Sequence, residues 1–88
     1  MALRIAADDI QRLIADVEAR LGGRASLHKV DGIRVEFPDG WALVRPSVTE
    51  AVVSLRFEGL DERSLERIIA EIEAASGLLA GKLSHLRR

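Results

Sequence analysis

The stretch DGIRVEFPDGWALV, residues 31–44, decides the fold. Apolar residues at every second position from Ile33 to Phe37 are typical of a β-strand with one buried face. The Asp-Gly pair that opens the stretch is a strong hairpin signal and predicts a partner strand over residues 26–30. The Pro-Asp-Gly in its middle predicts a second turn, which leads into a strand over residues 41–44.

A fourth strand is predicted over residues 51–58, after a short polar loop at residues 45–50. Val53, Leu55 and Phe57 are expected to point inward, and the residues that alternate with them, Ser54, Arg56 and Glu58, outward. Because short turns link all four strands, we expect them to be mostly antiparallel.

A helix is predicted before the strands, because five apolar residues follow helical spacing. Asp8 is the expected N-cap, with Gln11 completing a capping-box pattern. Gly22 and Gly23 are expected to end the helix, since glycine adopts the left-handed conformation at little cost. The apolar stripe consists of Ile10, Leu13, Ile14, Val17 and Leu21.

A second helix is predicted after the strands, beginning at Asp61 as N-cap and ending near Gly77. Its apolar stripe consists of Leu65, Ile68, Ile69 and Ile72. The tail at residues 78–88 is expected to be a short extra helix or a frayed end.

These elements predict one α+β domain over residues 1–88, built as a two-layer sandwich. A four-stranded antiparallel sheet would carry both amphipathic helices on one face, because a sheet with one polar face buries only the other.

Composition narrows the range of functions. The 13 basic and 14 acidic residues give a net charge of −1, which does not favour a nucleic acid as partner. The absence of cysteine excludes disulfides and thiolate chemistry and is consistent with a cytoplasmic protein. No apolar run approaches the roughly 20 residues that span a bilayer, so no membrane partner is expected.

The loop RPSVTE, residues 45–50, carries groups that bind phosphate. The guanidinium of Arg45 matches two phosphate oxygens at once, and Ser47 and Thr49 each supply a hydroxyl donor. The backbone from Ser47 onward retains its N–H groups and can curl into an anion-binding nest. The alternative is that these are ordinary loop residues in a simple connection.

Residues 31–50, DGIRVEFPDGWALVRPSVTE, followed by an apolar strand that ends in LRFE, resemble the C-terminal domain of the α-D-phosphohexomutases. The phosphomannomutase/phosphoglucomutase branch is the most similar. The resemblance implies a TATA-binding-protein-like sheet flanked by two helices. It also implies a lid that grips the phosphate of a hexose phosphate and completes the active site of a longer isomerase.

The resemblance carries the substrate phosphate-binding role onto Arg45, Ser47, Val48, Thr49 and Glu50. Val48 stands where the family usually has Asn or Gly, so either the geometry of the loop differs or Val48 contributes only its N–H. Ala51, in the following strand, stands where the family usually has Pro. Glu50 is expected to hold Arg45, to bind a sugar hydroxyl or to face water.

The catalytic parts of a mutase are not found in the sequence. It contains no phosphoserine loop and no D-x-D-x-D-R metal loop, so no catalytic residue, metal ligand or cofactor is assigned to this domain, and Mg²⁺ is expected in the rest of the parent enzyme. The expected partners are a phosphosugar and the other domains of that enzyme. The acids at Asp8, Asp9 and Asp16 are expected to complement the helix dipole.

Other histidine, tryptophan and arginine residues are not expected to carry the function. His28 and His85 have no partner that would make them catalysts. Trp41 is expected to pack in the core behind the loop rather than to stack on a sugar. Arg34 and Arg56 are expected to be solvated charges on the outer face of the sheet.

The competing hypothesis is a stand-alone interaction or dimerisation module. It would associate through the open face of the sheet or an edge strand, with Val44 and Val52 among the contacts.

Overall fold

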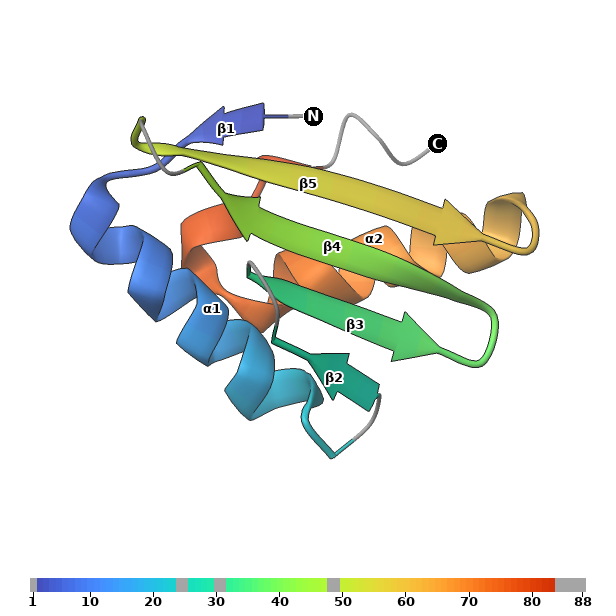
Figure 1. Cartoon of the computed structure of the whole chain (residues 1–88). Helices are drawn as coiled ribbons and strands as arrows, with labels where there is room; N and C mark the ends of the chain where they lie inside the picture. Colours follow the sequence, from blue (N-terminus) through green and yellow to red (C-terminus); the bar gives the residue numbers. More distant parts are fainter. Residues whose placement is uncertain (1, 24–25, 30–31, 48–49, 84–88) are drawn as a thin grey trace.

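A five-stranded antiparallel sheet, in the order β1-β5-β4-β3-β2, organises the chain in the computed structural model (Figure 1). The structure describes residues 2–23, 26–29, 32–47 and 50–83. The strands are β1 (Ala2–Arg4), β2 (Ser26–His28), β3 (Ile33–Phe37), β4 (Gly40–Pro46) and β5 (Val52–Gly59). The α+β class is therefore confirmed, whereas the expected number of four strands is wrong by one.

The unexpected strand is β1, which pairs antiparallel with Val52–Ser54 at the start of β5. The Ile5 amide extends this pairing by donating to the Ala51 carbonyl over 3.0 Å. A three-residue strand is too short to show a period-2 pattern, so only its pairing reveals it. The hairpin expected from Asp-Gly is confirmed, because β2 pairs with β3 along its whole length.

Two helices, α1 (Ala7–Leu21) and α2 (Glu62–Ala75), pack against one face of the sheet, as expected. Helix α2 contacts β4 and β5, and α1 contacts β3 and α2. Figure 1 shows both helices on the same side of the sheet, and no helix of the described residues lies on the other side. A 3₁₀ helix, η1 (Gly77–Leu79), follows α2 and packs on it.

The core lies between the sheet and the helices. The strands contribute alternate residues from β3, β4 and β5, and the two helical stripes contribute the rest. Leu79 and Leu83 are also fully buried, so the tail packs on the core as far as Leu83. The completely buried side chains are Leu13, Val17, Leu21, Ile33, Val35, Ala42, Val44, Val53, Ile68, Ile72, Leu79 and Leu83.

The residues of β4 that point into the core, Ala42 and Val44, contradict two sequence predictions. Val44 is fully buried between β3 and β5, opposite Ile33 and Leu55, so it cannot serve as an outward contact of a dimer. Trp41 consequently lies on the open face at the other end of β4 from the loop, and it does not pack in the core. Val52 is half-buried at the start of β5.

The helix ends agree with the sequence only in part. The cap of α2 is confirmed, since Asp61 Oδ1 accepts a 2.8 Å hydrogen bond from the Ser64 amide. The predicted cap of α1 is wrong, because α1 begins one residue before Asp8 and Ala6 occupies the N-cap without a side-chain hydrogen bond. Gly22 ends α1 in right-handed rather than left-handed conformation, with φ of −58°.

The turn between β3 and β4 is fastened to α2. Arg67 of α2 forms an ion pair with Asp39 in the turn, and its guanidinium lies 5.3 Å from the centre of the Phe37 ring. Leu60, which follows β5, donates its amide to the Asp39 carbonyl over 2.9 Å. None of the helices in the described part of the chain is long and apolar enough to cross a membrane.

Candidate functional site

The candidate loop begins where β4 ends. Arg45 is the last residue of β4 that points to the open face, opposite Ser54 of β5. It is exposed, and no ion pair joins it to any other residue in the described ranges. Its guanidinium is therefore accessible to a ligand, as the sequence prediction requires.

Gly32 fixes the backbone beneath Arg45. Its φ is +117°, in the region that favours glycine. A side chain on Gly32 would collide with the Val44 carbonyl oxygen and would lie only 3.0 Å from the Cα of Arg45. The close contact of these two backbone segments thus holds the end of β4 in place.

Hydrogen bonds within the chain occupy part of the loop. The Ser47 amide donates to the Val52 carbonyl over 2.9 Å, which continues the β4–β5 pairing. The Glu50 amide donates to Oγ of Ser47 over 3.3 Å. An anion nest that uses the Ser47 amide is therefore not available.

The other members of the predicted phosphate site are Val48, Thr49 and Glu50. Val48 and Thr49 lie outside the described residues. Glu50 is exposed and forms no ion pair with Arg45. Of the five candidate residues, the structure thus brings Arg45, Ser47 and Glu50 to one end of the β4–β5 hairpin.

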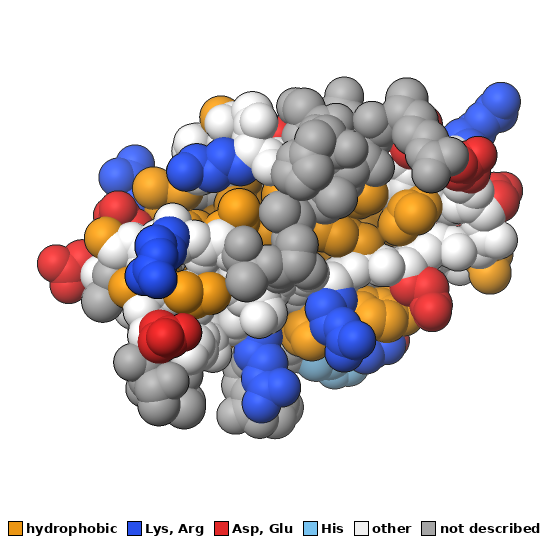
Figure 2. Space-filling model, turned by 90° about the horizontal axis from the view of Figure 1, so that it is seen from above, with side chains coloured by type: hydrophobic (Ala, Val, Ile, Leu, Met, Phe, Trp, Pro, Cys, Tyr) orange, Lys and Arg blue, Asp and Glu red, His pale blue; other side chains and the backbone are white. Residues whose placement is uncertain are grey.

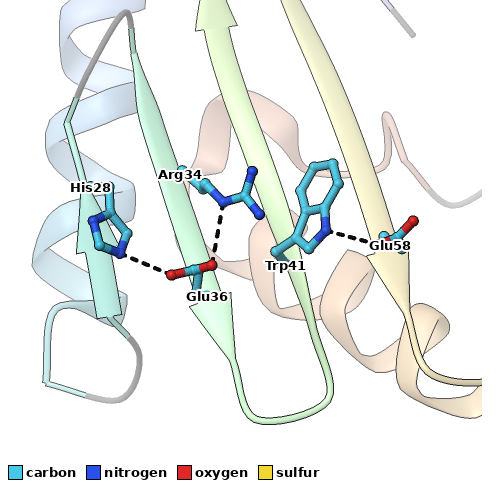
Figure 3. A network of polar contacts seen from close by, with 5 residues as sticks. All are labelled: His28, Arg34, Glu36, Trp41 and Glu58. Atoms are coloured by element: carbon cyan, nitrogen blue, oxygen red, sulfur yellow. Dashed lines mark hydrogen bonds and ion pairs between the residues drawn. The ribbon is translucent and has the colours of Figure 1, made fainter.

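A polar network crosses the open face at the opposite end of the strands (Figure 3). Glu36 of β3 accepts a 2.9 Å hydrogen bond from His28 of β2 and lies 3.5 Å from Nε of Arg34. The Arg34 guanidinium lies 4.5 Å from the centre of the Trp41 ring, and Trp41 Nε1 donates to Glu58 over 3.0 Å. Arg34 is thus not the merely solvated charge that the sequence suggested.

This network was not predicted from the sequence, although the strand register contains a signal for it. The register places Trp41 between Glu36 on one side and Glu58 on the other. Opposite positions on adjacent strands lie about 5 Å apart, within reach of one another's side chains. His28 is accordingly a surface residue that is hydrogen-bonded to Glu36, and His85 lies outside the described residues.

Side chains that could bind a metal ion do not cluster in the part of the chain that the structure describes. No group of three or more His, Cys, Asp or Glu side chains converges within the described residues. Asp8 and Asp9 lie in the first turn of α1, as expected for acids near a helix N-terminus. Asp16 instead accepts a hydrogen bond from Ser76.

The order of elements and the sequence match a known family of domains. Residues 3–75 match the family model for the C-terminal domain of phosphoglucomutase/phosphomannomutase. The chain belongs to this family. The resemblance seen in the sequence is therefore confirmed for the phosphoglucomutase/phosphomannomutase C-terminal domain.

Curated relatives carry related names. A probable phosphoglucosamine mutase of Methanocella arvoryzae is 34% identical over 68 residues, which cover 77% of this chain and 15% of the relative. A phosphomannomutase/phosphoglucomutase of Pseudomonas syringae pv. tomato is 52% identical over 46 residues, which cover 52% of this chain and 10% of the relative. The chain thus spans only a small part of the length of these enzymes.

A solved structure supports the same assignment. The crystal structure of a phosphoglucomutase/phosphomannomutase family protein from Burkholderia thailandensis matches with a TM-score of 0.66 and 35% identity. The match covers 81% of this chain and 16% of that chain. The two-layer fold described above is therefore shared with a member of the phosphoglucomutase/phosphomannomutase family.

Proposed function

We propose that this domain binds the phosphate group of a hexose phosphate, as the phosphate-gripping lid of a phosphomannomutase/phosphoglucomutase-like isomerase. The observation that carries the proposal is the exposed guanidinium of Arg45 near the end of β4, two residues before the exposed Ser47. A guanidinium and a hydroxyl on a short loop suit the oxygens of a phosphate dianion.

The domain would contribute binding and closure rather than bond breaking. Each charge-assisted hydrogen bond to the phosphate would contribute about 1.5–3 kcal/mol. This binding energy would favour closure over the sugar and exclude water from the reacting groups. The phosphoserine and Mg²⁺ would belong to other domains of the parent enzyme.

Titration followed by NMR tests the proposal directly. The ¹⁵N-labelled domain would be titrated with glucose 1-phosphate and mannose 1-phosphate at fixed ionic strength, because salt screens such contacts. We expect saturable shifts of the Arg45, Ser47 and Glu50 amides, and their loss in Arg45→Ala. Arg12→Ala, which removes an exposed arginine from α1, is the matched control and should bind like the wild type.

Two results would contradict the proposal. One is the absence of saturable shifts in the loop while other regions respond to the ligand. The other is an Arg45→Ala variant that binds as well as Arg12→Ala.

The dimerisation hypothesis has lost one of its two named contacts, because Val44 is buried. It stays a prediction that sedimentation equilibrium tests. A dimer at micromolar concentration that is disrupted by substitutions on the open face would favour it.

A further inference from the structure

Three arginines surround Ser54 on the open face of the sheet. Arg45 of β4 lies directly opposite Ser54, and Arg56 is two residues further along β5. Arg4 of β1 is opposite Val52, which places it diagonally across from Ser54 on the other side. All three arginines and Ser54 are exposed.

Sheet geometry brings these groups within reach of one ligand. Opposite residues lie about 5 Å apart, diagonal neighbours about 7–8 Å, and residues i and i+2 of one strand about 7 Å. An arginine side chain is long enough to cover such distances. The guanidiniums of Arg4, Arg45 and Arg56 can therefore converge above the Ser54 hydroxyl.

In the described part of the chain, these three arginines lack the ion-pair partners that two other arginines have. Arg34 has Glu36 and Arg67 has Asp39 as ion-pair partners. Within residues 2–23, 26–29, 32–47 and 50–83, the ion pairs include none with Arg4, Arg45 or Arg56. Like charges at neighbouring positions of a sheet are destabilising, so neighbouring guanidiniums without an ion-pair partner in the described ranges favour the binding of an anion.

Glu36 and Glu58 of the open face have other partners, although Glu58 follows Arg56 by two residues on β5. Glu36 contacts His28 and Arg34, and Glu58 accepts from Trp41, at the end of the sheet away from the loop (Figure 3). The side of the molecule that includes β1 and β5 carries separate Lys or Arg and Asp or Glu side chains around hydrophobic ones (Figure 2). The strand register places three arginines around Ser54 in a chain of net charge −1.

We infer that Ser54, Arg4 and Arg56 extend the phosphate site onto the open face and bind, together with Arg45, a phosphate monoester dianion. The inference rests on the proposed function, since the extension begins at Arg45. It adds a donor hydroxyl and two guanidiniums from β1 and β5 to a site otherwise confined to the loop. Three cations around one position favour a doubly charged anion over a singly charged one.

The test compares alanine variants at each position by the same titration with glucose 1-phosphate. We expect Arg4→Ala and Arg56→Ala each to raise the Kd about three- to tenfold, and Arg12→Ala to leave it unchanged. Acetate is a singly charged anion. At equal ionic strength, its Kd from the shifts of the same amides should be at least tenfold higher than that of inorganic phosphate. The spectra themselves show whether each variant is folded.

A substitution at the centre of the cluster gives an independent test. Ser54→Asp would place a carboxylate among the three guanidiniums and occupy them. We expect it to abolish phosphate binding and to raise the Tm, whereas the neutral Ser54→Asn should retain binding within about threefold. A carboxylate that leaves the Kd unchanged would overturn the inference.

The outcomes separate the two proposals. If Arg45→Ala weakens binding but Arg4→Ala and Arg56→Ala behave like Arg12→Ala, the extension is wrong and the loop site stands. If the wild type shows no saturable binding, both the loop site and its extension are wrong.

Discussion

Ser76 donates a 2.7 Å hydrogen bond from its hydroxyl to Oδ2 of Asp16, and thereby joins the end of α2 to the middle of α1. Ser76 is only 3% exposed, and its oxygen also accepts from the Leu78 amide over 3.3 Å. One hydroxyl thus links the two helices and caps η1. Since both helices cover the same face of the sheet, this contact helps to hold the layer behind the candidate site together.

The first prediction concerns this contact. Ser76→Ala leaves the Asp16 carboxylate and the Leu78 amide without their partner in a largely buried position. We expect the free energy of unfolding to fall by about 1–3 kcal/mol. Urea denaturation monitored by circular dichroism measures it. Ser26→Ala, an exposed serine of β2, is the control and should change stability by less than about 0.5 kcal/mol.

The second prediction concerns Gly32, which lies against the backbone of Val44 and Arg45. Gly32→Ala would force a side chain against the Val44 carbonyl at a positive φ. We expect a loss of at least about 2 kcal/mol in the free energy of unfolding, because both the φ and the contact oppose the side chain. Gly23→Ala has nothing within 4 Å of the added carbon and is the matched control. Equal stability of the two variants would contradict the contact beneath Arg45.

The third prediction tests the phase of β4. Val44→Gln would bury an amide without a partner and should cost about 3 kcal/mol. Leu43→Gln places the same side chain on the open face, where it should cost less than about 1 kcal/mol. Thermal unfolding of the two variants measures how much stability each substitution costs. A larger loss from Leu43→Gln would mean that β4 presents its other face to the core.

The strands β3 and β5 could be predicted with their faces because charged residues alternate with apolar ones in both. In β4 the run from Trp41 to Val44 is continuously apolar, so the pattern alone cannot determine which residues point inward. The structure fixes the phase through the tight turn, in which Phe37 pairs with Gly40 and Trp41 with Glu36. The expected core position of Trp41 and the expected exposure of Val44 both failed for this one reason.

The candidate site, like the strands, could be predicted from the sequence only in part. The composition of residues 45–50 indicated Arg45. The structure places Arg45 in β4 rather than in the loop, and it is exposed because it lies on the open face of the sheet. The use of the Ser47 amide depends on the pairing with Val52, which a loop composition does not reveal. The neighbour Arg4 became visible only with β1, whose pairing brings the start of the chain beside β5.

The last prediction concerns the N-cap of α2. The hydrogen bond from the Ser64 amide lowers the pKa of Asp61 below its ordinary value of 3.8. A carboxyl whose pKa is lowered by folding stabilises the folded state above its unfolded pKa. This contribution is lost as the pH falls through the lowered pKa. We therefore expect the stability of the wild type to decline in acid partly through Asp61.

Asp61→Asn separates the charge from the cap, because Asn is as good an N-cap as Asp but does not titrate. Its free energy of unfolding, measured in urea from pH 7 to pH 2, should depend less on pH than that of the wild type. Asp61→Ala lacks the cap at every pH and should be less stable than Asp61→Asn at pH 7. If Asp61→Asn loses stability in acid as steeply as the wild type, the carboxylate of Asp61 does not contribute as its hydrogen bond to Ser64 implies.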